Sequence, residues 1–402
     1  MNESSFNGTQ YKQNYSFALT SKPLSFLNAK IFYNYYDSED RSERITQTVE
    51  TATDSTTVTS RTFDYTKNSA GIELGLRLPA NLYLIPAYKY VKTDRSREDL
   101  PQTEDNIYSI DLRWTGLSFM TVNAGYERLQ RGADHERVIV ATGDPGDQTV
   151  ADGIEPFLRR YDVGPQERDT YRASVELYPM ESLNLGLGYQ FKRSDYENTV
   201  FGLRNDERYE FNVDADYTIG KFMRLFAYFD YERVRLYQFQ RQIPFGTTTN
   251  LGPFDAQTST RFNWNVTQID KSYDYGVAAD IYIIPRKLTL QLQYNSVDSD
   301  GEADYTYLFA PALSVGGSLR TNENIDINNW DDYRKNYFIA KAIYNMTKSL
   351  SLSAGYAYER FRYDDVQVDG YQYTFSGNFL TGANNDLSYS ANVVFATAAY
   401  RF

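Results

Sequence analysis

Apolar and polar residues alternate with a period of two in many short segments of this chain. In residues 183–191 every odd position is Leu, Tyr or Phe, and every even position is Asn, Gly or Gln. Residues 288–295 and 350–358 alternate in the same way. Because successive side chains of a strand point to opposite faces, these segments predict strands with one apolar face.

The second face of these predicted strands is charged. In residues 208–217 the apolar positions alternate with Arg, Glu, Asn and Asp. Such a face cannot be the core of a β-sandwich, but it can line a water-filled or protein-filled lumen. The charges have both signs, which predicts ion pairs between neighbouring strands. The predicted inward charges are Glu73, Arg77, Asp111, Arg113, Arg172, Glu176, Arg208, Glu210, Asp214, Asp274 and Asp280.

Short turns separate pairs of predicted strands, and long polar stretches separate the pairs from one another. The turns lie around Pro23 and in residues 78–82, 114–118, 178–183, 218–222, 284–288 and 345–350. The long stretches are residues 37–66, 92–105, 130–168, 194–206, 239–270, 297–332 and 364–386. Short turns on one side and long loops on the other are typical of outer-membrane barrels. The sequence therefore predicts an all-β fold, a transmembrane antiparallel meander barrel of about 15 visible strands.

The composition supports a membrane barrel. The chain has 37 Tyr in 402 residues, and tyrosine suits the boundary between hydrocarbon and headgroups. We expect Tyr356, Tyr358, Phe361 and Tyr363 on the outward face near a strand end. A tyrosine-rich sugar-binding surface is the competing interpretation. No stretch of about 18 apolar residues predicts a membrane-spanning helix.

The composition also excludes several classes of function. The chain has no Cys and one His, His135, so it cannot attach a c-type haem and offers neither a thiolate site nor a multi-histidine metal site. His135 lies in a polar run and is predicted to be a solvated loop residue, so we predict no enzyme activity. The net charge of −12 argues against a nucleic-acid partner.

Strand counting predicts how the two ends of the chain are placed. Seven hairpins and a last strand give an odd number, whereas bacterial barrels have an even number with both ends in the periplasm. Residues 1–10 are therefore interpreted as a loop remnant and residues 11–402 as the barrel domain. Either an ascending strand precedes residue 1, which we favour, or one strand near the start is misassigned. Residues 394–402 alternate and end on an aromatic residue, so Tyr400 and Phe402 are predicted to signal to the barrel assembly machinery.

Three stretches carry a resemblance to a known family. They are LSLSAGYAYERFRYDD (350–365) with DGYQY (369–373), RDTYRASVELYP (168–179) with LNLGLGY (183–189), and FGLRND (201–206) with FNVDADY (211–217) and LFAYFDYE (225–232). Together they resemble the C-terminal half of the MtrB/PioB family of outer-membrane barrels over residues 168–402. A Cys-x-x-Cys found near the start of some members is absent here.

The resemblance implies a bacterial outer-membrane barrel of about 26 strands, of which this chain would be the C-terminal portion. It implies a sheath around a periplasmic multihaem cytochrome, an extracellular cytochrome as a further partner, and haem on the cytochrome rather than on this chain. A diffusion channel for small solutes is the alternative function.

Small inward residues are candidate contacts with a protein in the lumen, because glycine in a strand often marks the close approach of another backbone. Relief of barrel curvature explains them equally well. These residues are Gly71, Gly75, Gly186, Gly188, Ser351, Ser353 and Gly355.

Residues 298–304 have the opening spacing of a calcium-binding loop, with Asp298, Asp300 and Asp304 around Gly301. The Glu that would close an EF-hand loop is replaced by Phe309. Calcium and plain solvation of an acidic loop both remain open for this segment.

Overall fold

The computed structural model describes residues 8–50, 55–59, 63–96, 101–134, 164–196, 199, 201–241, 263–308, 313–315, 318–320, 323–366, 374–376, 379–381 and 387–401. His135 and Phe402 lie outside these ranges. Regular structure within them is β-strand throughout, and no described helix is long and apolar enough to cross a membrane.

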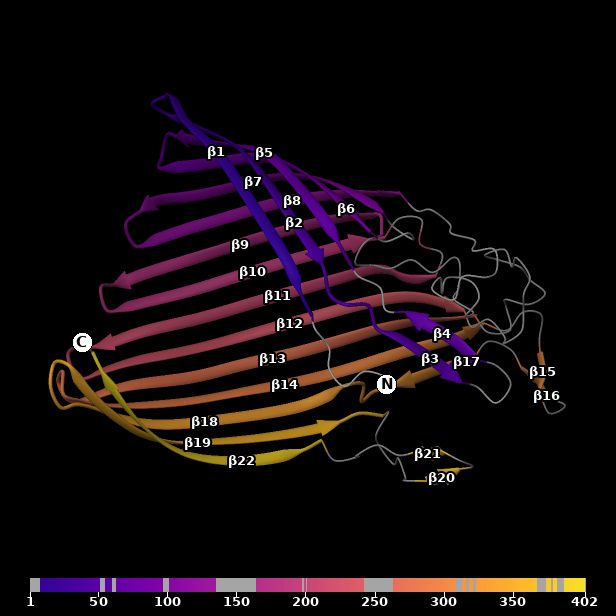
Figure 1. Cartoon of the computed structure of the whole chain (residues 1–402). Coiled ribbons are helices and arrows are strands. Elements are labelled where there is room, and N and C mark those ends of the chain that lie inside the picture. The colour runs from indigo at the N-terminus through magenta and orange to yellow at the C-terminus, as the bar shows by residue number, and fades with distance from the viewer. Residues whose placement is uncertain are drawn as a thin grey trace.

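Fifteen strands of the described chain follow one another in a single antiparallel meander. Figure 1 shows them side by side, with the short turns at one end of the sheet and the long connections at the other. The strands are β1 (Gln10–Leu24), β2 (Leu27–Asp40), β5 (Tyr65–Leu78), β6 (Leu82–Arg95), β7 (Gln102–Leu117), β8 (Met120–Asp134), β9 (Gln166–Met180), β10 (Leu183–Asp195), β11 (Gly202–Ile219), β12 (Met223–Arg241), β13 (Asn263–Ile284), β14 (Leu288–Leu308), β18 (Asp332–Asn345), β19 (Leu350–Asp364) and β22 (Tyr389–Tyr400).

The remaining strands belong to the long connections. β17 (Glu323–Ile327) pairs with the end of β14 and is the sixteenth strand of the sheet. Three small hairpins stand apart from the sheet. They are β3 (Thr46–Glu50) with β4 (Ser55–Thr59), β15 (Leu313–Val315) with β16 (Ser318–Arg320), and β20 (Thr374–Ser376) with β21 (Phe379–Thr381).

All seven predicted hairpins are present. The turn between β5 and β6 has positive φ at Ala80 (62°) and Asn81 (58°), the backbone that suits the right-handed twist of a tight hairpin. One turn was misplaced: β7 continues through Leu117, so the chain reverses at residues 118–119 and not within 114–118. The pairing with β8 shifts register between Trp114 and Leu117, so Gly116 lies in an irregular step of the strand and not in the turn.

Several predicted loops are strands in the structure. The four longest strands are β11 to β14, with 18, 19, 22 and 21 residues, whereas a membrane crossing needs about 9–11. The predicted loop 297–332 is wrong over its first part, because β14 continues to Leu308 and pairs with β13. The calcium-loop candidate 298–304 therefore lies in an extended strand. Asp298, Asp300 and Asp304 share one face of this strand, but successive positions on one face are about 7 Å apart, so the carboxylates are spread along the strand instead of wrapping around one ion.

The pairing register confirms that each strand has one polar and one apolar face. Leu187 of β10 lies opposite Val175 and Val213, whereas Gly188 lies opposite Ser174 and Asn212. Phe361 and Tyr363 were predicted to face outward with Tyr356 and Tyr358, and this is wrong. Phe361 lies opposite Lys335 and Tyr389, which places Phe361 and, two residues later, Tyr363 on the polar face. Both have odd numbers, whereas Tyr356 and Tyr358 have even numbers, so the alternation along the strand already put the two pairs on opposite faces.

The apolar face is exposed because the sheet is a single layer. Phe17 is 65% exposed and Val394 84%, so this face needs an apolar solvent. On β10 its apolar residues run from Leu183 to Phe191, about 26 Å along the strand, which matches the band of about 25 Å in outer-membrane barrels.

Aromatic and then charged residues end the apolar face at the loop side of the sheet. The ring centroids of Tyr126 and Tyr171 are 4.9 Å apart, and those of Phe191 and Tyr209 are 4.7 Å apart. The next row alternates in charge across five strands. Neighbouring charges of this row lie 3.2 to 3.8 Å apart at three of its junctions. The row consists of Arg128, Asp169, Arg193, Glu207 and Arg235.

Candidate functional site

The polar face of the sheet is the candidate functional site, because it carries every charge that was predicted to point inward. The register places all eleven of these residues on one face, from Glu73 on β5 to Asp280 on β13. The period of two was therefore read correctly on the five strands that carry them, β5, β7, β9, β11 and β13.

Ion pairs join neighbouring strands across this face, as predicted. Arg131 of β8 lies 2.7 Å from Asp105 of the neighbouring strand β7. Arg172 of β9 reaches past Gly125 of β8 to Asp111 of β7, at 3.0 Å. The Asp105 pair is the better shielded, with side chains 14% and 18% exposed. Further pairs on this face are Arg168–Glu127, Arg208–Glu232, Arg224–Asp216 and Lys335–Glu359.

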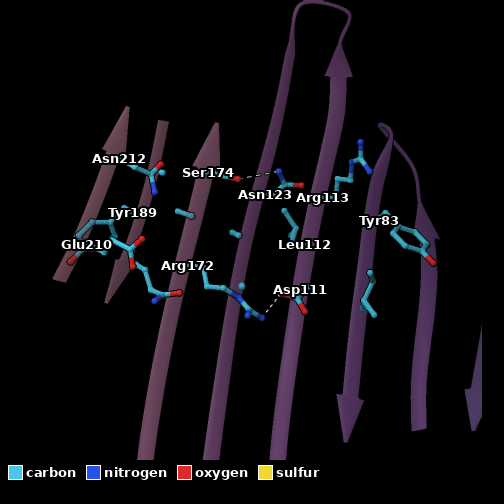
Figure 2. A pocket seen from close by; sticks show the side chains of 16 residues that line it. Tyr83, Asp111, Leu112, Arg113, Asn123, Arg172, Ser174, Tyr189, Glu210 and Asn212 are labelled. Carbon is cyan, nitrogen blue, oxygen red and sulfur yellow. Dashed lines mark hydrogen bonds and ion pairs between the residues drawn. The ribbon is translucent and has the colours of Figure 1, made fainter. Parts of the chain in front are cut away.

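A hollow of about 510 Å³ lies over β6 to β11 on the polar face. Figure 2 shows Asp111, Arg172 and Glu210 around it, with dashed lines for the Arg172–Asp111 pair and for the hydrogen bond that Asn123 donates to Ser174. These two contacts hold four of its polar side chains, Asp111, Arg172, Asn123 and Ser174. The hollow is a stretch of polar wall formed by the sheet itself.

The predicted small residues share the polar face. The chain's own side chains cover the glycines: a Cβ at Gly71 would meet the Phe32 ring at 2.5 Å, and one at Gly355 would meet the Phe395 ring at 2.5 Å. At Gly186 and Gly188 the covering groups are the Asp214 and Asn212 side chains. Ser353 shares a hydrogen bond with Thr397. Contact of these positions with a lumenal partner stays a prediction.

The glycines differ in what surrounds them. At Gly355 and Gly71 a Cβ would also meet backbone carbonyl oxygens, of Ala340 at 2.9 Å and of Tyr88 at 2.7 Å. At Gly188 the three nearest atoms all belong to one flexible Asn side chain. Aromatic rings over strand glycines are a known way of filling the gap.

An apolar hollow of about 370 Å³ interrupts the polar face on β18, β19 and β22, and the sequence reasoning missed it. Ile339, Ala357 and Val393 form one row across the three strands. Phe395 lies beside this row, and Val393 is 51% exposed. The missed signal was in residues 389–400, where neither parity is consistently polar.

Two acidic residues of the calcium-loop candidate form ion pairs on the apolar face of β14. Asp298 pairs with Arg334, and Glu302 pairs with Lys271. Among the described residues, no group of three or more His, Cys, Asp and Glu side chains is arranged to hold a metal ion. Just after β10, burial and the nearby Asp206 raise the pKa of Tyr196 above its usual range, so its hydroxyl donates a hydrogen bond to Asp206 at neutral pH.

Tyr400 ends β22 on the apolar face and is 61% exposed. Its role as an assembly signal, together with Phe402, stays a prediction.

Comparison with known proteins decides the family. The sequence model described as "Putative outer membrane beta-barrel porin, MtrB/PioB" matches residues 1–402. The chain belongs to the MtrB/PioB family. The match covers the whole chain and is not confined to residues 168–402, where the resemblance was first seen. Membership places this protein in the bacterial outer membrane, with the apolar face of its sheet toward lipid.

One sequence relative and two solved structures can be compared with this MtrB/PioB chain. Outer membrane protein MtrB of Shewanella baltica (strain OS185) is 20% identical over 386 residues, which are 93% of this chain and 48% of MtrB. The chain thus spans about half the length of that relative. A point mutant of the ferric enterobactin receptor PfeA of Pseudomonas aeruginosa is 10% identical, with a TM-score of 0.44 over 96% of this chain and 69% of the receptor. The FrpB iron transporter of Neisseria meningitidis (F5-1 variant) is 10% identical, with a TM-score of 0.40 over 100% of this chain and 67% of the transporter.

Proposed function

We propose that this chain forms part of the wall of an outer-membrane barrel. The barrel encloses a periplasmic multihaem c-type cytochrome and so makes a conduit for electrons. The cytochrome supplies the haem, because a chain without Cys cannot attach it through thioethers. The wall insulates the haem chain and catalyses no step. An extracellular cytochrome would receive the electrons at the loop side.

The observation that carries this proposal is the apolar hollow on the polar face. Ile339, Val393 and Phe395 lie together there, next to the polar residues Glu359 and Tyr337. In a water-filled pore these three apolar side chains would be exposed to water, and each would forgo the gain of being buried. Against a folded protein the same residues would be buried, as they are in the core of a protein interface. A lumen that holds a protein therefore explains this part of the wall better than an open pore does.

The width of the wall agrees with a larger barrel around the partner. Fifteen strands spaced about 4.8 Å apart and tilted by about 40° would close to a diameter of about 30 Å between backbones. A folded domain of 100 residues has a radius of gyration of about 13 Å, hence a diameter of about 34 Å. A wall with roughly twice as many strands, as the length of the MtrB relative permits, would leave room for such a domain.

A diffusion channel for small solutes is the second candidate function. It is favoured by the charges of both signs that line β6 to β11 around the hollow of Figure 2. Rings of charged side chains of this kind set selectivity in pores.

A pair of variants tests the enclosed cytochrome. We expect Ile339→Asp combined with Val393→Asp to lower the haem content of the purified full-length protein several-fold, because carboxylates would replace the apolar contact. Thr397→Asp, on the same face of β22 and next to Phe395 but not among the residues that line the hollow, should leave the haem content unchanged. Heat-modifiable migration on gels checks that both variants fold. Unchanged haem in the double variant would refute the contact.

A further inference from the structure

The charges on the polar face are sorted by strand. On β1, β2, β5 and β6 the described polar face has only two carboxylates, Asp40 and Glu73. Glu73 is matched by Lys30 at 3.8 Å. Cations dominate the rest of this basic sector: Lys12 and Lys22 on β1, and also Lys67, Arg77, Lys89 and Arg95. Thr20, Lys22 and Lys30 open onto a hollow of about 460 Å³.

The opposite excess occurs on β11 to β14, which we call the acidic sector. Two cations lie on its described polar face in paired register, Arg208 and Arg224, and each is already bound to a carboxylate of the sector. β11 contributes Asp206, Glu210, Asp214 and Asp216. β12 and β13 contribute Asp230, Glu232, Asp270, Asp274 and Asp280.

The strands between these sectors, β7 to β10, are nearly neutral. Three of their four carboxylates, Asp105, Asp111 and Glu127, are each held by an arginine of the same strands, at 2.7, 3.0 and 3.2 Å. The fourth, Glu176, accepts a hydrogen bond from the Tyr178 hydroxyl. Five strand steps separate β6 from β11, a distance of about 24 Å along the sheet. The Debye length at physiological ionic strength is about 8 Å, so the two sectors act on an occupant as separate patches of opposite sign.

We propose that the two sectors form a docking surface that fixes the rotation of a lumenal protein about the barrel axis. The partner would present lysine and arginine side chains to the acidic sector and carboxylates, including haem propionates, to the basic sector. A partner turned the other way would place like charges against each other, which costs several kcal/mol at an interface. This inference rests on the proposed function, since it concerns the same lumen.

Zero-length cross-linking of the natural full-length complex tests the orientation. A carbodiimide joins a carboxylate to an amine in contact by forming an amide and converting the carbodiimide to a urea. We expect Asp214, Asp230 and Asp274 to be joined to lysines of the haem-bearing protein, and Lys67 and Lys89 to be joined to its carboxylates. Asp230→Asn combined with Asp274→Asn should remove the links at these two positions and keep those at Lys67 and Lys89.

A charge reversal gives the matched control. Lys89→Glu should release the haem-bearing protein at a lower salt concentration than the wild type does. Lys92→Glu, on the apolar face of the same strand, should not. Cross-links spread evenly over β5 to β14, in a complex that does contain haem, would overturn the orientation but leave the proposed function standing. Purified barrel without a haem protein would overturn both.

The charge separation can also be measured without a partner, because the chain has no Cys. Thr20→Cys places one thiol in the basic sector, and Gln293→Cys places one beside β13 of the acidic sector. An anionic methanethiosulfonate should react faster than a cationic one at position 20, and the order should reverse at position 293. The same ratio of rates at both positions would overturn the inference.

Discussion

Leu187 is a position where a charge should cost this fold a great deal. Its side chain lies on the apolar face of β10, opposite Val175 and Val213. It is about 13 Å along the strand from Leu183, near the short turn, and about 20 Å from Arg193 in the charged row. This places it near the middle of the membrane, where an arginine on the lipid face of a barrel costs about 2–4 kcal/mol. We expect Leu187→Arg to lower the free energy of unfolding by that amount.

The assay is guanidinium unfolding of the full-length protein folded into lipid vesicles, followed by tryptophan fluorescence. The control is Gln190→Arg, three residues along β10 on the polar face, opposite Arg172 and Glu210. It should change the free energy of unfolding by less than about 0.5 kcal/mol. Equal losses in the two variants would refute the assignment of the faces.

Three further predictions concern single contacts. Gly355→Ala should lower the free energy of unfolding by about 1–3 kcal/mol in the same assay, because the new Cβ meets the Ala340 carbonyl oxygen. Gly188→Ala should lower it by less, because the Asn212 side chain can move aside. Equal losses in the two variants would contradict this. Asp105→Asn should lower the free energy of unfolding by about 1–3 kcal/mol, because it removes the charge from a shielded pair with Arg131. Asp195→Asn, which breaks a pair that is about half exposed, should lower it by less than about 1 kcal/mol. Tyr400→Ala combined with Phe402→Ala should reduce the assembled protein in the outer membrane several-fold in cells, yet leave refolding in detergent unchanged; normal assembly in cells would count against an assembly signal.

The faces of the strands were predictable because they depend on backbone geometry alone. Every inward charge from Glu73 to Asp280 followed from counting by two. The strand ends were not predictable in the same way. Beyond the membrane both faces become polar, so residues 298–304 have the composition of a loop although they pair with β13. Whether such a segment is a strand depends on its neighbour, which no local pattern shows.

Other features needed the pairing of distant segments. The cover over Gly355 comes from Phe395, forty residues later in the chain, so the sequence cannot show that the glycine is already filled. The apolar hollow joins Ile339, Ala357 and Val393 from three strands. Each of these residues is unremarkable within its own strand, and only the register brings them together. The charged residues of the two sectors can be read from the sequence, but their grouping into sectors cannot, because it depends on which strands lie side by side in the sheet.

Haem content and conductance, measured on one preparation of the natural full-length protein, test the enclosed cytochrome most directly. The protein would be purified from outer membranes in mild detergent, assayed for covalent haem per barrel, and inserted into planar bilayers. A lumen filled by a cytochrome predicts a fixed molar ratio of a multihaem protein to barrel and little ionic conductance. Large, stable open conductance from a preparation that contains no haem protein would contradict it and identify the chain as a channel.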